Sequence, residues 1–170
     1  MPGDPGSPPI SVDQDYLSGV TPESVPMAIS EHLSQVQLAV RTIVGNDVFT
    51  GAAFDEADLA NGHLFIYGTQ AAMLIAALDQ VGTDQRSRIT VVESPYSFSE
   101  LQTFITQADK LLRDDGLEPL WIAARHDGTG IEVTLKRSQD LPDDELIGAA
   151  NKALGGLPAF ITVSDPPINF

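Results

Sequence analysis

Apolar and polar residues alternate along this chain in a way that predicts the same unit twice. Residues 48–92 and 120–164 each show two short alternating stretches separated by a turn, then an apolar helical stretch, then a final strand. Shared features are an alanine pair in the first strand (Ala52–Ala53, Ala123–Ala124), a glycine before the second (Gly62, Gly130) and an Ile-Thr-Val triplet in the last (Ile89–Val91, Ile161–Val163). Either the unit is duplicated, or two ββαβ units are alike because hairpins draw on the same residues.

A longer helical pattern precedes the first unit. Thr21 provides an N-cap, Pro22 occupies the first helical position, and Gly45 ends the helix. Apolar residues recur every three or four positions between these limits: Val25, Ile29, Leu33, Val36, Val40 and Ile43. This spacing predicts an amphipathic helix.

A second helical pattern precedes the second unit. Ser97 and Glu100 form a Ser-x-x-Glu capping box, an apolar face follows, and Gly116 ends the helix. From residue 89 onward the predicted order is strand, helix, strand, strand, helix, strand, with the turn HDGTG at 126–130. This is the split βαβ (ferredoxin-like) order, which predicts an α+β fold with an antiparallel sheet and both helices on one face.

These patterns divide the chain into five segments. They are a flexible Pro/Gly-rich arm (1–19), an N-terminal helix (20–45), a first ββαβ unit (46–95), a second α-ββαβ unit (96–164) and an extended C-terminal tail (165–170). The tail contains two consecutive prolines, which cannot donate to a strand ladder and favour an extended course.

Composition restricts the partners more than the fold. The chain has 170 residues, 42% of them hydrophobic, which is enough for one domain or two small lobes. Its 24 acidic and 9 basic residues give a net charge of −15, which disfavours nucleic acid and anionic membranes as partners. The chain has no cysteine, no apolar run long enough to span a membrane, and a start without the basic and apolar segments of a signal peptide.

The candidate chemical groups favour structural roles. Ser94 lacks the G-x-S-x-G setting of an exposed nucleophile and is predicted to end a strand before a proline turn. His32 is expected at a helix surface, and His63 and His126 in hairpins, without the spacing of a metal site. We therefore expect no catalytic residue, no metal and no cofactor.

The acidic clusters, the glycine pair and the aromatic residues are also expected to have structural roles. The acidic clusters at 55–58, 114–115 and 143–145 lack EF-hand spacing, and Gly155–Gly156 ends a helix, which is the wrong side for phosphate. The aromatic residues fall on predicted apolar faces and are expected in the core: Phe65, Tyr67, Tyr96, Phe98, Phe104 and Trp121.

Several ordered motifs resemble one protein family. They are FTGAAFD (49–55), HLFIYG (63–68), the AAML helix (71–74), RITVV (88–92), YSFSEL (96–101) and the hairpin 121–135. In this order they resemble the pro-region of secreted actinobacterial chymotrypsin-like proteases, the streptogrisin and alpha-lytic type, over residues 46–164. The signal peptide and the catalytic domain that usually flank such pro-regions are missing from this sequence.

The resemblance implies a non-enzymatic module that assists the folding of a serine protease and then inhibits it through its C-terminal segment. Carried over by position, strand 159–164 and tail 165–170 would bind the protease. The implied partner-binding residues are Ile161, Val163, Pro166, Pro167, Ile168 and Phe170. Such a module would be secreted.

Two other hypotheses stay open on the sequence alone. A stand-alone acidic α+β interaction or regulatory module in a bacterial cytoplasm would explain the net charge and the absence of cysteine. An enzyme or small-ligand carrier would place its cleft between the two units. The oligomeric state is not predicted.

Overall fold

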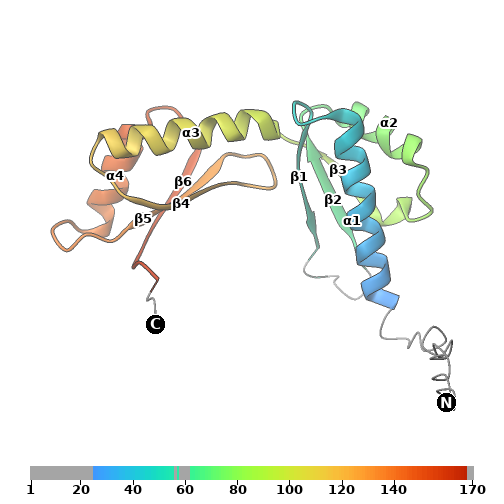
Figure 1. Ribbon diagram of the computed structural model, residues 1–170, viewed down its shortest axis with the longest axis horizontal. Coiled ribbons are helices and arrows are strands. Elements are labelled where there is room, and N and C mark those ends of the chain that lie inside the picture. The colour runs from blue at the N-terminus through green and yellow to red at the C-terminus, as the bar shows by residue number, and fades with distance from the viewer. Residues whose placement is uncertain (1–24, 56, 58–61, 168–170) are drawn as a thin grey trace, which may run out of the picture.

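The computed structural model describes residues 25–55, 57 and 62–167, which form two lobes lying side by side (Figure 1). The N-terminal lobe contains α1 (Val25–Val44), β1 (Phe49–Phe54), β2 (Leu64–Gly68), α2 (Ala71–Val81), the short 3-10 helix η4 (Arg86–Arg88) and β3 (Ile89–Glu93). The C-terminal lobe contains α3 (Phe98–Asp114), β4 (Pro119–Ala124), β5 (Ile131–Lys136), α4 (Asp143–Leu154) and β6 (Ala159–Ser164). The predicted arm, Thr21 and Pro22 lie outside the described residues.

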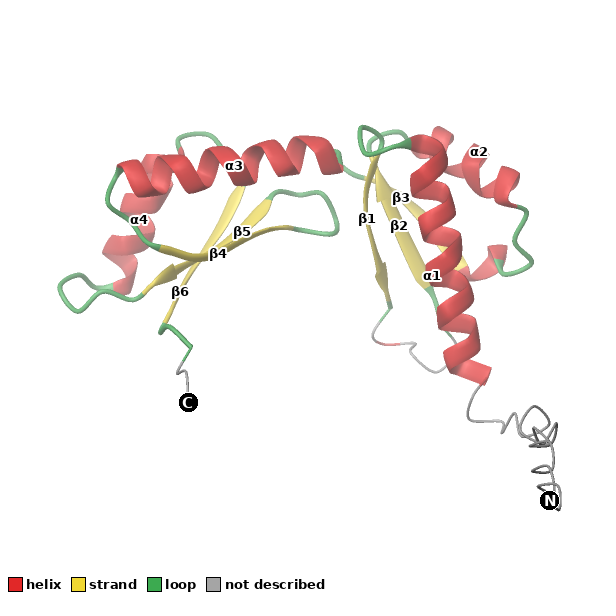
Figure 2. Ribbon diagram, viewed as in Figure 1, coloured by secondary structure: helices red, strands yellow, loops and turns green. Residues whose placement is uncertain are grey.

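Each lobe contains one three-stranded sheet, in the order β1-β2-β3 or β4-β5-β6. The central strand of each sheet is antiparallel to the first and parallel to the third. Figure 2 shows helices packed on one side of each sheet. The predicted α+β class and the one-sided cover of helices are confirmed.

The strand pairing differs from the prediction in two respects. The C-terminal sheet is mixed and not antiparallel, because the α4 crossover returns β6 parallel to β5 and directly beside it. Strand β3 pairs with β2 of the first sheet instead of completing a four-stranded split βαβ sheet with the second unit. In both lobes the crossover helix therefore joins neighbouring strands.

Both lobes have the same irregularity in the first strand. The register of β1 shifts between Phe49 and Gly51, and that of β4 shifts between Pro119 and Trp121. Such a bulge reverses the alternation of side chains between the two faces of a sheet. In β4, Pro119 is buried and Trp121 is exposed, although regular alternation would have placed both on the helix-covered face. The sequence prediction that Trp121 lies in the core is therefore wrong.

The core of each lobe is filled by side chains from its helices and by every second side chain of its central strand. In the C-terminal lobe, α3 and α4 contribute Leu101, Ala108, Leu112, Ala150 and Leu154, and the central strand contributes Ile131, Val133 and Leu135. In the N-terminal lobe, the corresponding set includes Leu33, Val40, Leu64, Ile66, Leu74 and Leu78. Among the described residues, no helix covers the opposite face of either sheet.

The two units share topology and bulge position, but the sequence motifs that suggested duplication are out of register. If the bulges are superposed, Ala52 corresponds to Ile122, so the two alanine pairs are offset by one residue. Ile89 corresponds to Ala159, so the Ile-Thr-Val triplets are offset by two. The repeat lies in the order and pairing of elements and not in these residues.

The predicted ends at Gly45, Ser97 and Gly116 are found where the sequence places them. The Ser97 hydroxyl accepts from the Glu100 N–H at 3.2 Å, and the Glu100 carboxylate accepts from the Ser97 N–H at 2.8 Å. This reciprocal pair satisfies two backbone donors that would otherwise lack partners at the start of α3. Gly45 and Gly116, with φ of +77° at each, follow the ends of α1 and α3.

Candidate functional site

The free edge of β6 is the first feature that could bind a partner. Within the described residues β6 pairs only with β5, and its sequence AFITVS has no charge and no proline. The other edge strand of this sheet, β4, starts at Pro119 and contains a bulge. Proline, bulges and charges are the usual protection of a sheet edge, so β6 is the less protected of the two.

The backbone direction of β6 follows from its hydrogen bonds to β5. The Ile131 N–H donates to the Pro158 carbonyl and the Arg137 N–H donates to the Ser164 carbonyl, both at 2.9 Å. Backbone groups point alternately to the two sides of a strand, so every second residue of β6 faces away from β5. Those residues are Ala159, Ile161 and Val163.

The structure places the predicted partner-binding residues in three different settings. The side chains of Ile161 and Val163 pack against the C-terminal core, so only their backbone groups reach the free edge. Pro166 and Pro167 are exposed beyond β6. Ile168 and Phe170 lie outside the described residues. The side chains that β6 offers to a partner are instead those of the uncovered face.

That uncovered face has a groove of about 300 Å³. It is lined by Trp121, Arg125, Glu132, Thr134, Phe160 and Thr162. Trp121 and Phe160 are 47% and 48% exposed, and the Thr134 and Thr162 hydroxyls are 3.1 Å apart between them. Aromatic residues and arginine are enriched at the energetic centres of protein interfaces. We call this set of six residues the open face.

Arg125 connects the open face to the turn between β4 and β5. Its guanidinium lies 4.3 Å from the centre of the Phe160 ring, and it donates to Glu132 at 3.4 Å and to Asp127 at 3.1 and 3.3 Å. Burial opposes ionisation of Asp127, but hydrogen bonds from Arg125 and from the backbone and hydroxyl of Thr129 lower its pKa to about 2. The Asp127 carboxylate is therefore ionised at neutral pH, and its hydrogen bonds hold the turn in place.

The same turn contacts the N-terminal lobe. Tyr67 and His126 meet edge to face with ring centres 5.6 Å apart, and burial together with the Asp127 charge raises the pKa of Tyr67. The buried hydroxyl of Thr50 lies 2.7 Å from that of Ser94 and donates to the Tyr96 carbonyl at 2.6 Å. The Tyr67–His126 contact joins the two lobes, and the Thr50 and Ser94 hydroxyls hold the segment where β3 leads into α3.

Two glycines allow this close approach of the lobes. A Cβ atom on Gly128 would lie 2.6 Å from Ser94 Cβ and 2.7 Å from Thr50 Cγ2, and a Cβ atom on Gly51 would lie 2.5 Å from the His126 carbonyl oxygen. Gly128 also has φ of +73°, which side-chain-bearing residues rarely adopt. Both glycines lie in motifs named from the sequence, FTGAAFD and HDGTG, but a glycine required by a contact between distant segments has no local signature of that role.

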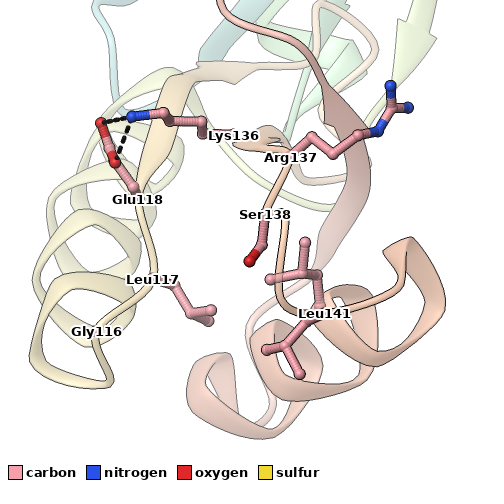
Figure 3. A pocket seen from close by; sticks show the side chains of 8 residues that line it. Gly116, Leu117, Glu118, Lys136, Arg137, Ser138 and Leu141 are labelled. Carbon is pink, nitrogen blue, oxygen red and sulfur yellow. Dashed lines mark hydrogen bonds and ion pairs between the residues drawn. The ribbon is translucent and has the colours of Figure 1, made fainter.

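Two further hollows have no convergent chemical groups. One of about 260 Å³ lies between the lobes and is lined partly by Arg41, Phe98 and His126. The other, of about 280 Å³, lies between the end of α3 and the start of α4 (Figure 3). There Lys136 is turned toward Glu118, with Nζ–Oε distances of 3.0 and 3.2 Å, so its charge is already paired. Both hollows are smaller than a typical small-molecule site.

Each of the candidate chemical residues has a structural contact of its own. Ser94 follows β3 and is buried, as predicted for the end of a strand. His32 bonds Thr83 at 3.1 Å and His63 bonds Thr90 at 2.8 Å, so each pairs with a hydroxyl in the N-terminal lobe. No group of three or more His, Asp or Glu in the described part of the chain could hold a metal ion. None of its helices is both long and apolar enough to cross a membrane.

No protein-family model matches this chain, and no curated protein matches it significantly. The function is therefore inferred from the residues and their geometry.

Proposed function

We propose that this chain is a non-enzymatic, protease pro-region-like module that binds a chymotrypsin-like serine protease through β6 and the C-terminal tail. It acts as an inhibitor, as a folding chaperone, or as both. The observation that carries the proposal is that an uncharged edge strand with free backbone groups continues directly into an exposed tail containing two prolines. An extended segment of this kind suits a protease cleft, which binds its ligands as added strands.

The arrangement also supports a folding role. The partner would pair with a strand that is already part of a sheet, so less conformational entropy is lost on binding than with a free peptide. A preformed strand can order a neighbouring strand of an incompletely folded partner. The uncovered Trp121 and Phe160 side chains beside that edge supply apolar area that such a partner would bury.

The test is inhibition of a panel of chymotrypsin-like bacterial proteases by the chain and by a form lacking residues 165–170. We expect tight inhibition by the full chain and weaker inhibition by the truncated form. Refolding of the same proteases from denaturant, with and without the chain, measures the chaperone activity separately. No inhibition and no effect on refolding across the panel would overturn the proposal.

A charge placed beside the β6 edge tests the strand. Thr162→Lys adds a charge to an exposed position of β6, and Thr106→Lys adds the same charge to an exposed position of α3 as the matched control. Lysine is a natural block to edge pairing, so we expect Thr162→Lys alone to weaken inhibition, by roughly tenfold. Equal inhibition by the two variants would exclude this edge as the contact.

A second candidate function is favoured by the net charge of −15. A stand-alone acidic interaction or regulatory module in a bacterial cytoplasm would bind a basic protein through its negatively charged surface. Its binding would weaken steeply with salt because charge attraction dominates. Failure of every protease assay, together with salt-sensitive binding of a defined basic partner, would favour this function.

A further inference from the structure

We infer that Arg137 is a positioning residue that sets the direction in which the C-terminal tail leaves β6. The inference rests on the proposed function, because it takes the tail to be the segment that the partner binds. It adds a specific side chain and a physical reason why residues 165–167 leave β6 in one direction before binding.

Arg137 joins three elements at one point. It follows β5 directly, and its backbone N–H donates to the Ser164 carbonyl at 2.9 Å. Its Nη1 donates to Asp165 Oδ2 at 2.8 Å, while Nε and Nη2 donate to the two carboxylate oxygens of Asp143, each at 3.1 Å. The end of β5, the start of α4 and the first residue after β6 are thus held by a single side chain.

The geometry of the guanidinium explains why this contact is directional. The paired bonds to Asp143 fix the plane of the group, because a planar fork matches a carboxylate in one orientation. With that plane fixed, Nη1 is directed at Asp165. The hydrogen bond to Asp143, followed by the charges of both carboxylates, raises the pKa of Arg137, so the group stays charged.

The next two residues extend the effect along the tail. Asp165 precedes Pro166 and is therefore restricted to extended conformations, and Pro166 restricts itself and is followed by Pro167. Once Arg137 holds the Asp165 side chain, few backbone dihedral angles of residues 165–167 can still vary. The direction fixed at Asp165 therefore persists over the prolines.

Exposure limits how strong the contact can be. The exposed fractions of the side chains are 44% for Arg137, 46% for Asp143 and 70% for Asp165. A single ion pair that is this exposed contributes little free energy. A three-group network with a paired fork holds better than one pair. We expect its loss to weaken binding of the tail by roughly three- to tenfold without unfolding the lobe.

The first experiment needs no partner. The chain has no cysteine, so spin labels can be placed at Asn151→Cys, on the exposed side of α4, and at Pro167→Cys, the last described residue of the tail. Electron spin resonance then gives the distribution of distances between the labels. We expect a narrow distribution with Arg137 and a broad one with Arg137→Ala. Equal widths would overturn the inference.

The second experiment measures inhibition with matched variants. Arg113→Ala is the control, because Arg113 is similarly exposed, pairs with Asp109 at 2.9 Å on α3 and changes the net charge equally. We expect Arg137→Ala and Asp165→Asn each to weaken inhibition three- to tenfold, and the double variant no more than the stronger single variant. Arg137→Lys keeps the positive charge but not the planar guanidinium, so we expect its inhibition to lie between that of the parent and that of Arg137→Ala. Arg113→Ala should match the parent.

These experiments distinguish a failure of the inference about Arg137 from a failure of the proposed function. If removing residues 165–170 weakens inhibition but Arg137→Ala does not, the inference is wrong and the proposed function stands. If no form of the chain inhibits any protease, the proposed function fails, and the spin-label distances alone decide whether Arg137 orients the tail.

Discussion

The contact between the two lobes at Gly128 can be tested by adding a single methyl group. Gly128 lies in the β4–β5 turn with φ of +73°, and a Cβ atom there would lie 2.6 Å from Ser94 and 2.7 Å from Thr50 in the other lobe. Both distances are well below van der Waals contact. Gly128→Ala therefore combines an unfavourable backbone conformation with an overlap between the lobes.

These two contributions can be separated by a matched glycine. Gly116 has φ of +77°, and a Cβ atom added there would meet no other atom within 4 Å, so Gly116→Ala carries only the backbone penalty, of about 1 kcal/mol. Overpacking in a tight contact adds about 1–3 kcal/mol. We therefore expect Gly128→Ala to destabilise the chain by about 2–4 kcal/mol and Gly116→Ala by about 1 kcal/mol.

The assay is urea unfolding of the parent and both variants, combined with small-angle X-ray scattering of the folded proteins. Two folded-state outcomes agree with a tight contact. Either the extra destabilisation is present with an unchanged radius of gyration, or the lobes separate, the radius increases and the extra penalty is partly relieved. Equal destabilisation by the two substitutions, with no change in scattering, would refute the close packing of the turn against Ser94 and Thr50.

Other consequences of the structure can be measured independently. The pKa of Asp127 is lowered from 3.8 to about 2 in the folded chain. Ionised Asp127 therefore adds roughly 1–2 kcal/mol to the free energy of unfolding above pH 5, and this contribution is lost as the pH falls toward 2. The difference in unfolding free energy between the parent and Asp127→Asn, measured by urea unfolding at each pH, should decrease over the same range. Ser97→Ala removes one half of the capping box and should destabilise the chain by about 1 kcal/mol in urea unfolding. Trp121 is the only tryptophan and is 47% exposed, so its fluorescence should be quenched readily by acrylamide. Trp121→Ala should change the unfolding free energy by less than about 1 kcal/mol, whereas Leu112→Ala in the core should cost about 2–5 kcal/mol.

Local sequence signals were sufficient to predict the elements and the two hairpins but not the pairing of the third strands, β3 and β6. The capping box at Ser97 and the glycines after α1 and α3 act through hydrogen bonds and backbone angles within a few residues, so they can be recognised in sequence. Whether β3 pairs with β2 or joins the sheet of the second unit depends on contacts between distant segments. The α2 crossover returns β3 beside β2, and the lobe is complete before α3 begins.

The open face shows why the candidate site was only partly predictable. The alternation in LWIAA is compatible with Trp121 in the core, and only the bulge between Pro119 and Trp121 moves it to the uncovered side. Because a bulge depends on the pairing of two strands, single-strand periodicity does not show it. Ile161 and Val163, which the resemblance implied as partner-binding residues, direct their side chains at the core, so only their backbone groups are accessible at the β6 edge.

The two repeated units differ most in the environment at the end of their last strand. After β3, Ser94 is buried, lies 2.7 Å from the Thr50 hydroxyl and receives the turn of the other lobe, so this end of the first unit is occupied within the chain. The corresponding position of the second unit is Ser164, which is exposed and followed by Asp165 and two prolines. The same ββαβ unit thus uses one strand end to join the lobes and leaves the other accessible. An accessible strand end beside an unprotected edge is the place where this fold can bind another protein without disturbing either core.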